Sequence, residues 1–360
     1  MSKNKEEREW FPLSVKDVES MRFDRWYPVF RKLTIRSEII PLSERFVRYV
    51  LKDGIVLPRS EVDLSKEDPR FEPMIVEEDS SDEDWDDEEE KDTRPVFRKL
   101  EIEIRDSIRK LGGAAFAKVN WSSANDAKWV SGSVKCTTPG HVFLLLKSSD
   151  FISQSVTRSG PRRYCSDFEK DEEEQDLEKN SVLVLRRWGN IALSQEFRCF
   201  VQNHQIIALS QRDVFSYYDF LESRKDCVRT CVSTFFKEKM LPLLKSSGIP
   251  NSFVMDVFLD RKDKVHLIDL SVLGKATDTL LFSLSDLQLA SNRIQNETSF
   301  QFEIRFVRSK KQILPSGRNF YCLPKDMLDR MSGSDDTGSS NSSVADIAKE
   351  VVTRERRKGD

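Results

Sequence analysis

The sequence predicts an α+β fold with mainly antiparallel sheets, on two kinds of pattern. Short segments rich in Val, Ile, Leu and Phe recur through residues 181–270, and Asn203-His204 separates two of them by the spacing of a hairpin turn. Residues 95–111 and 224–244 instead carry apolar side chains at helical spacing. With 360 residues, of which 38% are hydrophobic, the chain can bury a substantial core.

The patterns predict strands and helices in two lobes, which we set at residues 93–150 and 181–330. The predicted strands are 114–121, 128–130, 142–147, 182–188, 196–201, 205–211, 253–259 and 264–270. We group the strands at 182–188, 196–201 and 205–211 in one central sheet. A further helix pattern covers residues 43–51.

An aromatic segment precedes the lobes. Residues 23–30 contain four aromatic side chains, and we expect residues 1–76 to pack on the main body. Trp26, Tyr27 and Phe30 are candidate partner-binding residues, because aromatic clusters anchor protein partners. The alternative, packing of these rings in the core, stays open.

Acidic and polar stretches interrupt or end the predicted lobes. Residues 77–92 carry twelve acidic side chains, whose repulsion and low apolar content predict a disordered linker. Residues 151–180 are also polar and acidic, and we expect a mobile loop there. Residues 331–360 include a Gly/Ser-rich stretch that predicts a flexible tail.

Charge and hydropathy exclude several classes of protein. The formal net charge is only -3, so the chain as a whole attracts neither nucleic acid nor acidic lipid. Met1–Trp10 lacks the apolar core of a secretory signal, and no apolar run approaches the length of a membrane span. The cysteines show no CxxC spacing and the histidines no ligand spacing, so we expect a cytoplasmic protein without a zinc site.

Each of the last two predicted strands contains one carboxylate inside an apolar run. If Lys262-Asp263 forms a two-residue turn, antiparallel pairing puts Asp256 opposite Asp269, with β-carbons about 5 Å apart. Strand alternation puts Ser271 on the same face. Two carboxylates this close share a proton or hold a cation, and their oxygens suit Mg²⁺ with a phosphate substrate. The alternative, a pair that faces solvent or binds Lys and Arg, stays open.

Cations in apolar surroundings are candidate phosphate ligands. Lys118 and Lys147 each end an apolar run, and Arg198 alternates with apolar residues inside a strand. For the lysines, extension of the ammonium group into solvent is the alternative. The phosphate-loop, kinase and hydrolase motifs GxxxxGK[ST], GxGxxG, HRD, DFG, GxSxG and HExxH are all absent.

Several unusual strings follow one another through residues 23–330. The strings are RWYPVF, FAKVNWSSANDAKW, FLLLKSSDF, VLVLRRW, EFRCFV, SQRD and the hairpin FVMDV…HLIDL. In their sequence and order they resemble the cell division cycle protein 123 family. The resemblance implies an ATP-grasp-like fold whose two lobes clasp ATP and magnesium. It also implies a chaperone, not an enzyme, which promotes assembly of eukaryotic translation initiation factor 2 by binding its gamma subunit.

The resemblance further implies which residues contact ATP. They are Lys118 and Asn120 from the first lobe, Val184, Arg186 and Trp188 from the hinge strand, Arg198 at the phosphates, and Asp256 and Asp269.

The metal ligands implied by the resemblance are Asp256, Asp269 and the residue at position 271. That residue is Ser271, where the family has Asn, and Lys275 stands where an acidic residue is common. Magnesium affinity is therefore expected to fall, and we hypothesise that the Lys275 ammonium replaces part of the metal charge.

Two alternatives to a monomeric assembly chaperone stay open. An ATP-grasp ligase would transfer phosphate to a carboxylate before an amine displaces it, which requires intact metal ligands. A protein-only adaptor would have lost nucleotide binding altogether.

Overall fold

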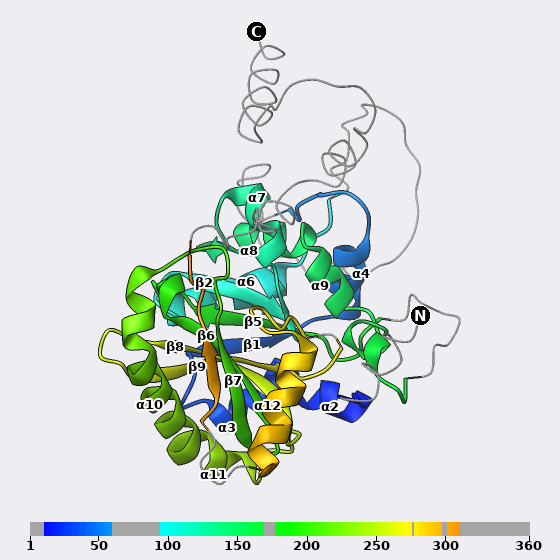
Figure 1. Cartoon of the computed structure of the whole chain (residues 1–360). Helices are drawn as coiled ribbons and strands as arrows, with labels where there is room; N and C mark the ends of the chain where they lie inside the picture. Colours follow the sequence, from blue (N-terminus) through cyan, green and yellow to red (C-terminus); the bar gives the residue numbers. More distant parts are fainter. Residues whose placement is uncertain (1–10, 60–93, 169–176, 276, 297–300, 310–360) are drawn as a thin grey trace, which may run out of the picture. The chain divides into compact units, whose positions relative to one another are not determined.

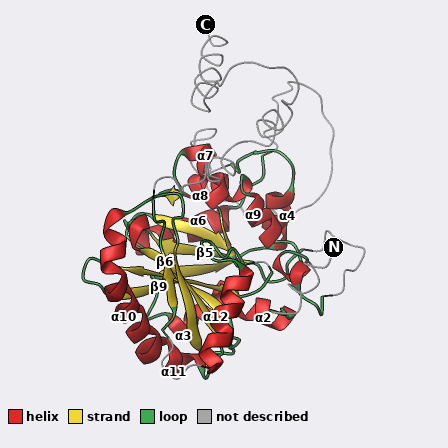
Figure 2. Cartoon of the chain, in the orientation of Figure 1, coloured by secondary structure: helices red, strands yellow, loops and turns green. Residues whose placement is uncertain are grey.

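Two β-sheets form the framework of the protein. The computed structural model describes residues 11–59, 94–168, 177–275, 277–296 and 301–309. Within these ranges the first sheet has the strand order β1-β5-β2-β3 with β4 beside β2, and the second has the order β10-β7-β6-β8-β9. The β10–β7 pair is parallel and the other pairs are antiparallel, which confirms the α+β class (Figure 1 and Figure 2).

The strands and helices have the following bounds. The strands are β1 (Ser37–Pro41), β2 (Ala115–Val119), β3 (Ser122–Ser123), β4 (Lys135–Cys136), β5 (Val182–Arg187), β6 (Glu196–Gln202), β7 (Gln205–Gln211), β8 (Phe253–Leu259), β9 (Val265–Val272) and β10 (Glu303–Arg305). The α-helices are α2 (Val15–Ser20), α3 (Phe23–Phe30), α4 (Glu44–Leu51), α6 (Arg98–Lys110), α7 (Lys128–Ser131), α8 (Pro139–Lys147), α9 (Asp150–Ser155), α10 (Lys225–Phe235), α11 (Leu241–Leu244) and α12 (Leu284–Asn296). Short 3₁₀ helices are η1 (Asn125–Ala127), η2 (Pro161–Tyr164), η3 (Leu193–Gln195) and η4 (Asp219–Arg224), and η5 (Phe236–Met240) is a π-helical turn that joins α10 to α11.

The first sheet buries one face under helices. Ala117 of β2 and Leu185 of β5 belong to a buried cluster with side chains of α4, α6 and α8. The opposite face turns toward the second sheet, because Val184 of β5 belongs to the same buried cluster as Phe23 of α3 and Met255 of β8. Polar side chains on the face of the first sheet that turns toward the second sheet are therefore shielded from solvent by neighbouring elements.

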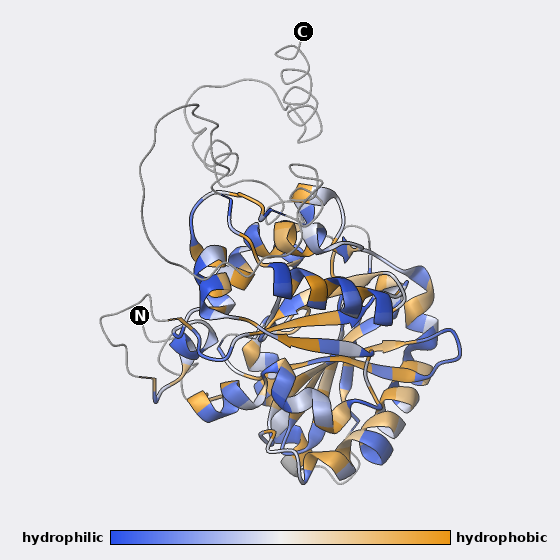
Figure 3. Ribbon diagram, turned by 180° about the vertical axis from the view of Figure 1, so that it is seen from behind, coloured by the Kyte–Doolittle hydropathy of each residue, from blue (hydrophilic) through white to orange (hydrophobic). Residues whose placement is uncertain are grey.

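The second sheet is covered on both faces. Phe197 and Met255 pack in one cluster with side chains of α10, α11 and α3. Phe200 and Val254, on the opposite face, pack with Leu287 of α12. Helices therefore lie on both sides of this sheet (Figure 1), and its strands are largely orange, that is hydrophobic, in Figure 3.

The two predicted strands at 128–130 and 142–147 are wrong, since both segments are helical. Thr138 caps α8 by accepting a hydrogen bond from His141 N at 3.3 Å, and Pro139 occupies the first helical position. The run Val142–Leu146 is buried between the sheet and other helices, so it lacks the alternation that separates a strand from a buried helix. Residues 128–130 continue the 3₁₀ turn η1 into α7, which ends at Gly132 with a left-handed φ of 70°.

The prediction of one central sheet is also wrong, because one of its three strands belongs to the other sheet. Strand β5 forms as predicted, but it pairs with β1 and β2 in the first sheet, not with β6. The β6–β7 hairpin is confirmed, and both turn residues, Asn203 and His204, adopt the left-handed conformation that a two-residue turn requires. The predicted helices at 43–51, 95–111 and 224–244 are confirmed by α4, α6 and the α10–η5–α11 run.

The predicted loop 151–180 contains regular structure in its described part. Ile152 of α9 is buried, and Arg162 and Glu178 form a buried ion pair. The acidic linker 77–92 and the tail 331–360 lie outside the described residues, and the lobe boundaries stay predictions. Among the helices that the structure describes, none has the length and apolar character needed to cross a bilayer.

The aromatic helix α3 yields a stability prediction. Trp26 is 1% exposed, so Trp26→Ala should lower the free energy of unfolding by about 3–5 kcal/mol through the cavity it leaves. The exposed neighbour Arg25 serves as a control, and Arg25→Ala should change stability by less than about 0.5 kcal/mol. Urea unfolding followed by circular dichroism measures both. Equal stability of the two variants would contradict a core role for this ring.

Candidate functional site

The candidate site begins with two carboxylates on neighbouring strands, Asp256 on β8 and Asp269 on β9. The prediction that they face each other is confirmed, but the predicted two-residue turn is wrong. Asp260 N donates to Lys264 O at 2.9 Å, so three residues form the turn, and the last, Asp263, has a left-handed φ of 58°. This turn alone would misalign the carboxylates by one residue.

A β-bulge corrects the register. Val257 pairs with Leu267, whereas Asp256 pairs with Asp269, which leaves Ile268 as the extra residue. The opposition of the two carboxylates therefore depends on a longer turn and a bulge whose effects on the register cancel.

Arginines hold Asp256. Arg198 of β6, which lies directly across from Asp256, donates from Nε to Oδ1 and from Nη2 to Oδ2, both at 2.8 Å. Arg212, just beyond β7, adds an ion pair from Nε to Oδ2 at 3.1 Å. Asp256 is only 5% exposed, and burial would raise its pKa, but Arg198 and Arg212 lower that pKa to about 2.

A lysine from the other sheet holds Asp269. Lys118 of β2 is 2% exposed, and its Nζ forms an ion pair with Oδ2 of Asp269. Burial and the nearby Arg186 lower the pKa of Lys118, while Asp269 raises it. Leu270 N donates to the other oxygen, Oδ1, at 3.1 Å. This ion pair connects the two sheets directly.

Arg186 of β5 lies beside this ion pair with spare hydrogen-bonding capacity. It is 3% exposed, and burial lowers the pKa of its guanidinium, which Asp269 partly offsets. Nη2 donates to Thr34 Oγ1 at 3.1 Å. Nε has no hydrogen-bond partner within the described part of the chain. Lys118 and Arg186 lie 5.4 and 5.2 Å from the centroid of the Phe23 ring of α3.

Cations outnumber carboxylates in this cluster. We call it the cation cluster, and its members are Lys118, Arg186, Arg198 and Arg212 around Asp256 and Asp269. Asp278 is exposed at its edge, where its carbonyl accepts from Arg198 Nη1 at 2.8 Å and its carboxylate accepts from Leu280 N at 3.1 Å. An excess of buried positive charge favours binding of an anion such as phosphate.

The donor set does not fit Mg²⁺ in this arrangement. Each oxygen of Asp256 and Asp269 accepts from a cation or a backbone N–H. Ser271, the third predicted ligand, is exposed. Within the described ranges, no three His, Cys, Asp or Glu side chains are grouped as a metal site would require. Lys275, the hypothesised substitute cation, is exposed beyond β9, while the cations that hold the carboxylates come from β2, β6 and the end of β7.

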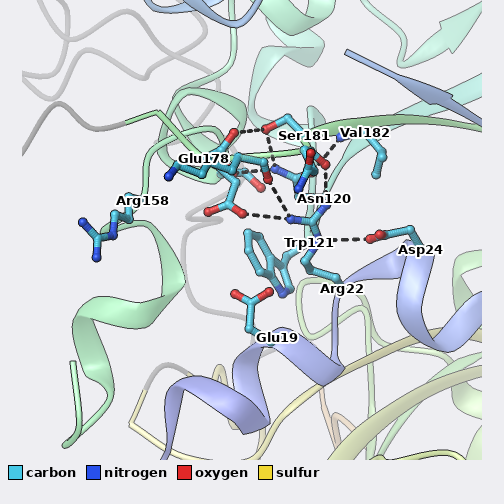
Figure 4. A network of polar contacts seen from close by, with 12 residues as sticks. Glu19, Arg22, Asp24, Asn120, Trp121, Arg158, Glu178, Ser181 and Val182 are labelled. Carbon is cyan, nitrogen blue, oxygen red and sulfur yellow. Dashed lines mark hydrogen bonds and ion pairs between the residues drawn. The ribbon is translucent and has the colours of Figure 1, made fainter. Parts of the chain in front are cut away.

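Asn120 serves the backbone rather than the cation cluster. It follows β2 with a left-handed φ of 50° and is fully buried. Its Nδ2 donates to Ser155 O at 2.8 Å and to Ser181 Oγ at 3.2 Å, while Oδ1 accepts from Val182 N at 2.9 Å. These contacts fix the turn after β2 to the start of β5 (Figure 4).

A second buried charge network adjoins Asn120, centred on Trp121 (Figure 4). Glu178 accepts from Arg22 Nη1 at 2.9 Å and from Arg162 Nη1 at 2.5 Å. Both guanidinium groups lie 5.4 Å from the centroid of the Trp121 ring, whose Nε1 donates to Val18 O at 2.8 Å. The network connects the N-terminal helices to the segment before β5, and Glu178 bridges the two arginines.

Several other predicted residues have structural contacts. Val184 is buried opposite Lys118, and Trp188 is half-buried with its N–H donating to Ala114 O at 3.1 Å. Lys147 ends a helix, not a strand, and its ammonium donates to Tyr49 O at 2.7 Å and to Val50 O at 3.2 Å. Lys147 therefore caps the carboxyl end of α4 and is not near the cation cluster's carboxylates.

The candidate partner-binding aromatics lie in the core. Trp26, Tyr27 and Phe30 are 1%, 5% and 0% exposed. Phe23 lies against the first two, with ring centroids 4.7 Å from Trp26 and 5.0 Å from Tyr27. These rings therefore pack in the core, which is the alternative that the sequence left open. They present no surface to a partner in this structure.

Sequence reasoning missed Arg212, Phe23 and Thr34 as contributors to the site. Arg212 could have been found, since extending the predicted β6–β7 hairpin by one residue brings it beside Glu196, and Arg212 N donates to Glu196 O at 3.0 Å. Phe23 and Thr34 reach the site through contacts between distant segments, for which the local pattern gives no indication.

Comparisons with known proteins identify close similarity over most of the chain. The model of the D123 family matches residues 26–331. A Xenopus tropicalis protein named translation initiation factor eIF2 assembly protein is 36% identical over 325 residues, which cover 88% of this chain and 92% of the relative. A Schizosaccharomyces pombe protein of the same name is 32% identical over 330 residues, covering 89% and 93%. The solved structure of Cdc123 from Schizosaccharomyces pombe superposes with a TM-score of 0.64 at 30% identity, covering 83% of this chain and 100% of that one.

Removal of the buried carboxylate should destabilise the fold. Asp256→Asn leaves Arg198 buried without its counter-ion, and we expect a loss of about 3–5 kcal/mol in the free energy of unfolding. Asp226, whose side chain is 99% exposed, provides the matched control, and Asp226→Asn should have almost no effect. Chemical denaturation of the three proteins at neutral pH measures this. A cost below about 1 kcal/mol would refute a structural ion pair.

The same carboxylate predicts a pH dependence. The folded-state pKa of Asp256, about 2, lies below the ordinary 3.8, so its contribution is fully present above pH 3.8. As the pH falls from 3.8 towards 2, protonation removes about 2 kcal/mol of that contribution. The stability difference between the parent protein and Asp256→Asn should therefore shrink over this range. If this stability difference widened on acidification, the lowered pKa of Asp256 would be contradicted.

Proposed function

Because the chain belongs to the D123 family, we propose that it promotes assembly of translation initiation factor eIF2 as a binding protein rather than as an enzyme. Its client would be the gamma subunit of that factor, and it would act in the cytoplasm. The observation that carries this proposal is the extent of the similarity. Relatives that bear the name eIF2 assembly protein match the chain over 92% and 93% of their own length.

ATP binding is the second part of the proposal, and the cation cluster supports it. A triphosphate is a strong anion, and four cationic side chains surround the buried Asp256 and the half-buried Asp269 at the junction of the two sheets. The Nε of Arg186, which is buried and has no hydrogen-bond partner among the described residues, offers a further donor. When bound, ATP would supply negative charge that attracts side chains from both sheets at once.

In this role the residues of the chain bind and orient rather than transfer a group. Lys118 and Arg186 extend from the first sheet, and Arg198 from the second. An anion held by all three would strengthen the connection between the sheets that the Lys118–Asp269 ion pair already makes. A more rigid pair of sheets loses less conformational entropy when the client subunit binds.

The alternatives make different demands on the same residues. A ligase would need carboxylate oxygens that are free to coordinate metal, whereas those of Asp256 and Asp269 already accept hydrogen bonds. An adaptor without nucleotide would have no use for the cation cluster, and burying excess charge there would be costly without an anion. Both features favour a nucleotide-binding assembly protein.

Replacement in fission yeast tests the assembly function, since that organism has a relative 32% identical to this chain. In cells depleted of that relative, expression of this chain should restore growth and the amount of assembled eIF2 heterotrimer recovered by affinity purification. The native relative and an empty vector provide the two controls. If the chain accumulates as soluble protein but restores neither growth nor heterotrimer, the proposed function is wrong.

A further inference from the structure

The carboxylates that the family resemblance assigns to magnesium are already occupied by the protein. Both oxygens of Asp256 accept from Arg198 at 2.8 Å, and Oδ2 also contacts Arg212 at 3.1 Å. In Asp269, Oδ2 accepts from Lys118 and Oδ1 from Leu270 N at 3.1 Å. A metal ion would therefore have to share every one of these oxygens except Asp269 Oδ1 with a cation of the protein.

Displacing those cations would be unfavourable. Arg198 and Lys118 are buried, so each would lose its counter-ion without gaining access to water. Mg²⁺ also requires near-octahedral coordination by oxygens at about 2.0–2.1 Å, and the exposed Ser271 offers a shorter group than the amide it replaces. The metal would add positive charge to a site where cations already exceed carboxylates.

The positive charge that a metal would bring to a triphosphate is already present on side chains. Arg186 is only 3% exposed, and its Nη2 donates to the uncharged hydroxyl of Thr34 at 3.1 Å. Its Nε is buried and has no acceptor among the described residues, which is unfavourable for a charged N–H group. A phosphate oxygen would provide that acceptor.

We propose that the cation cluster binds the phosphate groups of a nucleoside triphosphate directly, without a divalent metal ion, and that Arg186 is the residue on which this binding depends most. This inference rests on the proposed binding of ATP. It assigns to Arg186 and Lys118 of the first sheet and to Arg198 and Arg212 of the second the charge neutralisation that magnesium performs in other nucleotide sites.

Calorimetric titration of the full chain with ATP tests the metal dependence. We expect binding in the presence of EDTA, with an affinity equal to or higher than that in excess Mg²⁺, because the metal reduces the negative charge that attracts the cluster. Binding that requires Mg²⁺, or that strengthens about tenfold or more on its addition, would overturn the inference and leave the proposed ATP binding intact. Absence of binding under both conditions would overturn the proposed ATP binding itself.

Substitution of two neighbouring arginines of β5 tests the contribution of Arg186 to ATP binding. Arg186→Gln removes the charge and the unpartnered donor, and we expect ATP affinity in EDTA to fall at least about tenfold. Arg187, the next residue of β5, is exposed, so Arg187→Gln should change affinity less than about twofold. Circular dichroism and thermal unfolding establish that both variants fold. Equal affinities in the two folded variants would remove Arg186 from the site, while the metal dependence of the unmodified chain still tests direct binding.

Discussion

Burial of charge where the two sheets meet constrains the rest of this structure. Asp256 and Asp269 lie on adjacent strands of the second sheet, and the buried Asp256 needs cations close by to offset the loss of water. Arg198 and Arg212 serve Asp256 from within that sheet, but Lys118, the partner of Asp269, comes from the first sheet. The ion pairs therefore fix the strand register within one sheet and the contact between both.

The aromatic helix α3 belongs to this arrangement as a support. The Phe23 ring lies 5.4 Å from the Lys118 ammonium and 5.2 Å from the Arg186 guanidinium, and Trp26 and Tyr27 pack around the ring. Cations near an aromatic face gain electrostatic stabilisation without a counter-ion. The aromatic side chains of α3 thus support the cation cluster, and because they are buried they offer no surface to a partner.

The geometry of the site bears differently on the proposed anion and on a metal ion. The relatives bear the name of an eIF2 assembly protein, and the cation cluster has the charge that a nucleotide requires. The carboxylate oxygens are nevertheless occupied, and Ser271 faces solvent. A site with an excess of cations can hold phosphate by itself, so the proposed nucleotide binding does not depend on a metal ligand at position 271.

The sequence by itself determined the family, the β6–β7 hairpin, the helices at 43–51, 95–111 and 224–244 and the opposition of Asp256 and Asp269, because hydrophobic periodicity and turn residues act over short distances. Even so, it predicted that opposition from a two-residue turn, whereas a three-residue turn and the bulge at Ile268 produce it. Only the tertiary structure decided that β5 joins the first sheet, that the apolar run 142–147 is a helix, and that Lys118 forms an ion pair with Asp269. The physical reason is that sheet membership and buried ion pairs arise from contacts between segments far apart in the chain, and local patterns carry no information about which distant segment supplies the partner.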